Sequence, residues 1–379
     1  MATSTLRVAR AVTPDGVVDD AVITIDDGRI VSVTPGVAGE GLRLWAVPGF
    51  VDTHTHGAVG YSFGDPHPAN NQAIIDHHRS HGSTTMFAST VTEPVEKLVA
   101  QEKVLAGLVA AGELAGIHLE GPFLAPERKG AHDIDLLRDP TPELVERLIG
   151  AGGPALKMIT LAVERNHGEE ATRRFREAGV AVAFGHSDAD DVTTAESVEW
   201  GANVVTHLFN AMRPIHHRLP GPVPVMLSDE RVMVELICDG VHLAPVVAGM
   251  AIDAAGPGRV ALVTDAMSAT GTGDGRYVLG ELDVIVTDGT ARLATADGSP
   301  GAIAGSTLTM DRAFQFVVEQ VGVSIPDAAL MAATTPALWH GLDEVGALET
   351  GRFADVCLVD DDGALHGVMR RGEWVVAPA

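Results

Sequence analysis

The hydrophobic positions of this chain fall into short runs that are separated by longer amphipathic stretches. Most of eight such runs are apolar and rich in β-branched side chains, which is typical of strands covered on both faces. They are Ala46–Thr53, Thr84–Thr90, Gly116–Glu120, Leu156–Leu161, Ala181–Gly185, Ala202–His207, Val232–Cys238 and Val260–Thr264. Helical patterns separate most of them. Strand and helix in alternation predict an α/β fold with a parallel sheet, and eight units favour a closed (β/α)8 TIM-like barrel over an open doubly wound sheet.

Both ends of the chain carry a different pattern. Leu6–Val12, Val17–Ile25 and Ile30–Val33 are short strand-like runs with turn signals between them, and Ala354–Val359 and Val368–Val376 are similar. We therefore expect a small β-sandwich domain built from residues 1–47 and 345–379, with the barrel domain over 48–344. Residues 271–304 are rich in Gly and Asp and predict a hairpin excursion near the site, a candidate lid.

The charge balance narrows the range of partners. The chain has 26 Lys and Arg against 51 Asp and Glu, a net charge of −25, which argues against binding nucleic acid or anionic membranes. An anionic substrate would need a local cluster of cations. Two cysteines, a first segment without a signal-like apolar core and no apolar run of about 18 residues lead us to expect a cytoplasmic protein.

Metal-binding side chains follow the predicted strands at their C-terminal ends, which is the face where barrel active sites are built. His54 and His56 are two residues apart on one strand and therefore point to the same side. Three further candidates end other strands: Glu120, His186 and His207. This donor set suits Zn²⁺ or Fe²⁺, as one ion or as two ions bridged by Glu120.

Each of these motifs is weak alone, but their convergence at several strand ends is not expected from core or surface residues. Asp265 ends an apolar strand, where it is either a hydrogen-bonded structural residue or a general base that takes a proton from water beside the metal. The remaining histidines are given structural interpretations. His77, His78 and His81 are expected on a solvated helix face, His118 in the core, and His340 and His366 outside the barrel without a chemical role.

Several segments of the chain resemble known enzymes. Pro48–Asp52 before the His-x-His pair and Gly351–Asp355 resemble the amidohydrolase superfamily. His118–Phe123, Lys129–His132, Thr206–Met212, Asp239–His242 and Val263–Ala266 are similar, more narrowly, to the N-acetylglucosamine-6-phosphate deacetylases of that superfamily. The likeness covers nearly the whole chain.

This resemblance implies a hydrolase that removes the acetyl group from a phosphorylated amino sugar. It implies metal ligands at Glu120, His186 and His207, with Asp265 as the catalytic acid and base. His132 would donate a hydrogen bond to the acetyl carbonyl. The sugar phosphate would be held by Asn210, Ala211, Arg218 and His242. The resemblance also implies a homodimer in which His217 and Arg218 reach the partner's site.

The phosphate assignment has support from the residues themselves. Met212–Leu219 is a basic segment in an acidic chain, and an arginine such as Arg218 can bind phosphate through two hydrogen bonds. The alternative is a surface loop with incidental cations.

Two other functions stay open at this point. One is a different amidohydrolase, acting on a cyclic amide or an N-acyl amino acid, although no bridging lysine is evident at the expected strand end. The other is a non-catalytic scaffold of the same fold, which would have no need of the metal ligands and Asp265.

Overall fold

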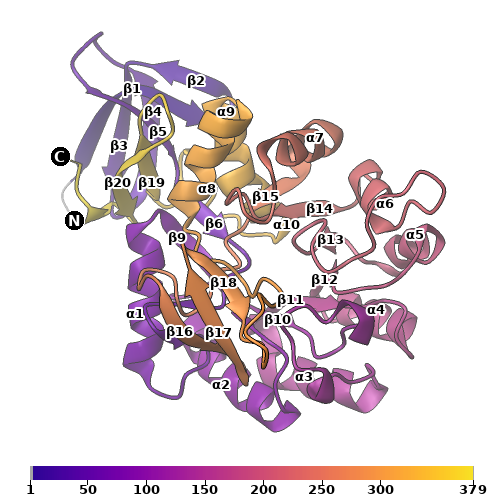
Figure 1. Cartoon of the computed structure of the whole chain (residues 1–379). Coiled ribbons are helices and arrows are strands. Elements are labelled where there is room, and N and C mark those ends of the chain that lie inside the picture. Colours follow the sequence, from indigo (N-terminus) through magenta and orange to yellow (C-terminus); the bar gives the residue numbers. More distant parts are fainter. Residues whose placement is uncertain (1–2, 379) are drawn as a thin grey trace.

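In the computed structural model, which describes residues 3–378, eight parallel strands follow one another around a barrel (Figure 1). Their order along the sheet is the order in the chain. They are β6 (Phe50–Asp52), β9 (Ser83–Thr90), β10 (Gly116–Glu120), β11 (Leu156–Leu161), β12 (Ala181–Phe184), β13 (Val204–Val205), β14 (Met233–Leu236) and β15 (Val260–Leu262). The fold class predicted from the sequence is confirmed.

Side chains complete the barrel between its first and last strands. The hydroxyl of Thr264 donates to a carboxylate oxygen of Asp52 at 2.7 Å, and the other oxygen accepts from the backbone N of Thr264 at 3.3 Å. Just beyond, the backbone N of Asp265 donates to the carbonyl of His54 at 2.8 Å. The residues that follow β6 and β15 are therefore held together at the C-terminal face.

Helices surround the barrel. They are α1 (Pro68–Ser80), α2 (Val95–Ala110), α3 (Pro142–Gly152), α4 (Gly168–Glu177), α5 (Asp191–Trp200), α6 (Pro222–Ser228), α7 (Pro245–Ala255), α8 (Met310–Phe316), α9 (Ile325–Ala329) and α10 (Thr335–Trp339). Several begin with proline in the first turn, where its missing N–H has no helical partner to lose. No helix within residues 3–378 is long and apolar enough to cross a membrane.

The two chain ends meet in a separate sheet, as predicted (Figure 1). Its strands are β1 (Ser4–Thr13), β2 (Gly16–Asp19), β3 (Ala21–Asp26), β4 (Arg29–Pro35), β5 (Leu42–Pro48), β19 (Val356–Val359), β20 (Leu365–Arg370) and β21 (Glu373–Val376). Pairing is antiparallel except between β1 and β5. Apolar side chains from both ends, among them Ile23 and Leu358, share one core. The residue limits set above for the two domains stay a prediction.

Two local features differ from the sequence-based expectation. The run Ala46–Thr53 is not one strand: it divides at Gly49, where β5 of the small sheet ends and β6 of the barrel begins. A Cβ at Gly49 would lie 2.3 Å from the hydroxyl of Thr84, so the close approach of β9 requires glycine. The excursion holds three strands where two were expected: β16 (Gly275–Leu279), β17 (Leu282–Thr287) and β18 (Thr290–Leu293).

Candidate active site

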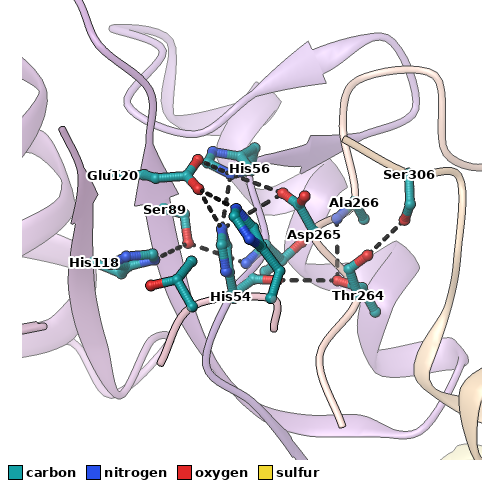
Figure 2. A network of polar contacts seen from close by, with 12 residues as sticks. His54, His56, Ser89, His118, Glu120, Thr264, Asp265, Ala266 and Ser306 are labelled. Atoms are coloured by element: carbon teal, nitrogen blue, oxygen red, sulfur yellow. Dashed lines mark hydrogen bonds and ion pairs between the residues drawn. The ribbon is translucent and has the colours of Figure 1, made fainter. Parts of the chain in front are cut away.

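The polar strand ends singled out in the sequence meet at one face of the barrel. His54 and His56 follow β6, Glu120 ends β10, and Asp265 follows β15. Figure 2 shows their side chains turned toward one another. The Nε2 atom of His56 lies 3.2 Å from Glu120 Oε2 and 3.1 Å from Asp265 Oδ1. The Nε2 atom of His54 lies 3.1 Å from that of His56.

A second pair of histidines approaches the other side of Glu120. The Nε2 atoms of His186 and His207 each lie 3.1 Å from Glu120 Oε1 and 3.1 Å from each other. One carboxylate therefore stands between the His54–His56 pair and the His186–His207 pair. All five side chains are buried.

The hydrogen bonds made by the Nδ1 atoms, on the side of each ring away from Glu120, show that this arrangement fits a cation. His186 Nδ1 lies 2.9 Å from the carbonyl of Arg128, and His54 Nδ1 lies 3.1 Å from a carboxylate oxygen of Glu235. Both partners accept, so both Nδ1 atoms carry the proton and both Nε2 atoms present a lone pair. Lone pairs that converge on a carboxylate repel one another unless a positive ion lies between them. The residues present can hold a divalent metal, with Glu120 able to bridge two ions.

The carboxylates of the cluster favour a positive charge at this place, whether a proton or a metal ion supplies it. Burial lowers the pKa of His54, but the carboxylates of Asp265, Glu120 and Glu235 outweigh that effect and raise it well above its usual value. Conversely, burial raises the pKa of Asp265, yet His54 and His56 together hold it at about 2. The charge of His54 and hydrogen bonds from His132, His186 and His207 keep the pKa of Glu120 well below its usual range despite burial. Asp265 and Glu120 are thus ionised and available as ligands or bases.

His132 approaches Glu120 from the loop after β10. Its Nε2 atom lies 3.4 Å from Glu120 Oε2. Its Nδ1 atom accepts a hydrogen bond from the backbone N of Thr92 at 3.2 Å, so the ring proton is on Nε2. Burial lowers the pKa of His132 to about 4, which keeps the ring neutral near pH 7. The side chain therefore offers one N–H donor to the site.

Unusual backbone conformations coincide with these side chains. His186, His207 and Asp265 have φ angles of 48°, 29° and 48°, in the left-handed region that residues other than glycine seldom adopt. Each such residue costs about 1–3 kcal/mol and persists where the surrounding structure determines it. Strain concentrated at the strand ends supports a functional site there.

Residues 45–375 match the model of the amidohydrolase family. This chain is an amidohydrolase. Among curated relatives, an N-acetylgalactosamine-6-phosphate deacetylase of Escherichia coli O157:H7 is 34% identical, with 98% of this chain and 99% of the relative covered. An N-acetylglucosamine-6-phosphate deacetylase of Vibrio furnissii is also 34% identical, over 94% of this chain and 91% of the relative.

Solved structures show the same likeness. A variant of the N-acetyl-D-glucosamine-6-phosphate deacetylase of Mycobacterium smegmatis, in complex with N-acetyl-D-glucosamine-6-phosphate, is 40% identical with a TM-score of 0.94 and full coverage of both chains. The N-acetylglucosamine-6-phosphate deacetylase of Thermotoga maritima is 31% identical with a TM-score of 0.90, over 99% of this chain and 100% of that one.

The residues predicted to bind the substrate fall into two groups. Asn210, Ala211 and His242 line a cavity of about 270 Å³ together with His56, Glu120, His186 and His207. Burial lowers the pKa of His242, but Asp239, 2.7 Å from its Nδ1 atom, more than offsets this and raises it. The raised pKa favours the charged form of His242, which suits an anionic group at that end of the cavity.

His217 and Arg218 lie elsewhere. They occupy an exposed loop, where the Arg218 guanidinium lies 2.7 Å from His217 Nε2, and they are not among the residues lining this cavity. The single chain therefore does not bring them to the cluster. Their expected role in a partner's site stays a prediction.

The structure also corrects the sequence interpretation of other histidines. His78 is fully buried, not solvated: its Nε2 atom contacts the carbonyl of Gly57 at 3.1 Å. His77 and His81 are only partly exposed. His118 is buried between Ser89 and Thr160 and contacts both, at 2.9 and 2.8 Å, as expected of a core residue.

Sequence reasoning missed three residues around the site. Glu235 contacts His54 from β14, Thr92 sets the tautomer of His132, and Leu279 of the excursion lines the cavity. Glu235 carried a signal, since an acidic residue inside an apolar strand is costly unless it has partners. Thr92 and Leu279 carried none, because only the folded chain brings them to the site.

Proposed function

We propose that this chain hydrolyses N-acetylglucosamine 6-phosphate to glucosamine 6-phosphate and acetate, in the breakdown or recycling of amino sugars. The observation that carries the proposal is Glu120 between two histidine pairs, with Asp265 and His132 at the same cavity. The relatives named above support a phosphorylated, N-acetylated amino sugar as the substrate class.

The metal is best taken as Zn²⁺ or Fe²⁺, held by His54, His56, Glu120, His186 and His207 as one or two ions. A divalent ion there would polarise the amide carbonyl and lower the pKa of a water molecule from 15.7 toward about 7.

The side chains around the ion would carry the protons. Asp265, ionised and directed at the cluster, accepts a proton from the attacking water and later returns it to the departing amine. His132 donates its Nε2–H to the carbonyl oxygen as negative charge develops there. The cavity lining formed by Asn210, Ala211 and His242 would bind the sugar phosphate.

The assembly and location proposed for the protein follow from fewer observations. A homodimer is favoured because His217 and Arg218, the basic residues expected to bind phosphate, are exposed on a loop and do not reach the site of their own chain. In such a dimer they would complete the phosphate site of the partner. A cytoplasmic location suits Cys238 and Cys357, which are both buried free thiols.

The first experiment measures acetate release from N-acetylglucosamine 6-phosphate, with unphosphorylated N-acetylglucosamine and N-acetylgalactosamine 6-phosphate as parallel substrates. Metal content is determined on the same sample. Fast release from the glucosamine phosphate alone is the expected result. Release from the galactosamine phosphate instead would move the assignment to the epimer. No release from any of the three, with metal bound, would refute the proposed substrate class.

Asp265→Asn tests the proton transfer. The variant is expected to lose at least about a thousandfold in kcat, since general acid–base catalysis contributes about 10²–10⁴. Asp253→Asn, the same change at an exposed position on α7, is the matched control and should turn over normally. Near-wild-type turnover by Asp265→Asn with metal bound would show that another group moves the proton.

A further inference from the structure

Glu235 is a buried carboxylate within the apolar strand β14. It has no exposed surface, and it follows Met233 and Val234 and precedes Leu236. An ionised carboxylate in such a place is costly unless hydrogen-bond donors surround it. Three donors do. The Nδ1–H of His54 lies 3.1 Å from Oε2, the backbone N of His207 lies 3.4 Å from Oε2, and the hydroxyl of Thr53 lies 3.4 Å from Oε1.

These contacts place Glu235 beneath both histidine pairs. It orients the ring of His54 from one pair and contacts the backbone of His207 from the other. The carbonyl of Glu235 also accepts from the backbone N of Leu208 at 2.9 Å. One residue of β14 thus links the segment after β6 to the segment after β13 under the cluster.

The four histidines differ in the hydrogen-bond partners of their Nδ1 atoms, which lie on the side of each ring away from Glu120. Within residues 3–378, Nδ1 of His56 and Nδ1 of His207 have no hydrogen-bond partner, and that of His186 donates to a backbone carbonyl. His54 has an anionic partner in Glu235. A carboxylate at this position fixes the tautomer and makes the other nitrogen a stronger ligand.

We propose that Glu235 is a positioning residue that enables a divalent ion to bind on the His54–His56 side of the cluster. Without it, the His54 ring loses both its tautomer and its orientation, and that side no longer presents two converging lone pairs. The His186–His207 side keeps its own ring partner in the Arg128 carbonyl and retains its ion. The inference rests on the proposed metal centre and not on the identity of the substrate.

The test compares metal binding by the wild type, Glu235→Met and Glu235→Gln. Methionine matches the length of glutamate but accepts no such hydrogen bond, whereas glutamine keeps a carbonyl oxygen for His54. Glu102→Met is the matched control, because Glu102 is also a fully buried glutamate but lies on α2. Each protein is stripped of metal, titrated with Zn²⁺ against a chromophoric chelator, and analysed for bound zinc and thermal unfolding.

We expect two zinc ions in the wild type and in Glu102→Met, and one in Glu235→Met. Glu235→Gln should bind two, the second about 10–100-fold more weakly than in the wild type. Two ions of unchanged affinity in Glu235→Met, or a single ion in the wild type, would overturn the proposal. If Glu235→Met does not fold, Glu235→Gln decides, and wild-type affinity in that variant would overturn it. None of these readouts uses substrate turnover, so failure of the proposed function would be seen separately.

Discussion

Glu102 offers a quantitative test of how burial controls a carboxyl group in this protein. Its side chain lies on α2 with no exposed surface, and within residues 3–378 neither carboxylate oxygen has a hydrogen-bond partner. Burial raises its pKa from 4.5 to about 8. The folded protein therefore holds this carboxyl in its protonated form at neutral pH, whereas the unfolded chain ionises it.

The sign of the effect follows from the protons bound in each state. Because the pKa is raised on folding, the native state binds more protons between pH 4.5 and about 8, and the free energy of unfolding falls as the pH rises through that window. A pKa that differs by one between the folded and unfolded states changes the free energy of unfolding by about 1.36 kcal/mol. Between pH 5 and pH 8 the loss amounts to about 3 kcal/mol.

Glu102→Met removes the titrating group while keeping its length and burial. Urea unfolding of both proteins, at pH 5 and at pH 8 with zinc present, gives the difference in stability at each pH. The free energy of unfolding of the variant, taken relative to that of the wild type, should be about 3 kcal/mol higher at pH 8 than at pH 5. Other titrating groups are common to both proteins and cancel. An identical difference at pH 5 and pH 8 would show that Glu102 ionises normally and would refute this reasoning.

Three further predictions concern the site. His132→Ala should lower kcat about 10²–10³-fold, the usual cost of losing one oxyanion donor, and steady-state kinetics with an unchanged kcat would remove His132 from that role. Arg218→Ala should raise KM for the phosphorylated sugar and leave an unphosphorylated analogue unaffected; an equal effect on both would exclude phosphate binding. Chelation should abolish acetate release and lower Tm, with both restored by zinc, since a ligand at 100 times its Kd stabilises by about 2.7 kcal/mol. A chelated protein with unchanged Tm would contradict the buried metal centre.

The sequence predicted the barrel because its signals are local. Each strand is an apolar run, and the polar residues that end it stand next to it in the chain, so the order of residues alone places Glu120 and His186 at one face. The terminal sheet was predicted on similar grounds. The division of Ala46–Thr53 at Gly49 was not, because it depends on the approach of Thr84 from another strand.

His78 shows a signal that was present in the sequence but was given the wrong meaning. The run of histidines near the end of α1 suggested a solvated face. Ile74 and Ile75, however, precede His78 by four and three residues and share its side of the helix. All three are buried, and His78 satisfies one ring nitrogen on the carbonyl of Gly57. The helical period was a better guide than residue polarity.

The buried acidic residues Glu235, Asp52 and Glu102 differ in the number of hydrogen-bond donors that surround their carboxyl groups. Glu235 has a histidine N–H, a backbone N–H and a hydroxyl within 3.4 Å, and these donors belong to His54, His207 and Thr53 at the histidine cluster. Asp52 accepts from Thr264 and from the backbone N of His54, and it joins the first and last strands of the barrel. Among the residues that the structure describes, Glu102 has no such donors, and its carboxyl is held neutral.

The contrast makes the two glutamates a matched pair of tests. If the surrounding donors decide how a buried glutamate behaves, the two substitutions should differ in effect. Glu235→Met should lose one bound zinc ion, whereas Glu102→Met should raise the free energy of unfolding at neutral pH. Similar losses of bound zinc and of stability in both variants would mean that burial alone governs these groups. The role assigned to Glu235 beneath the two histidine pairs would then have no basis.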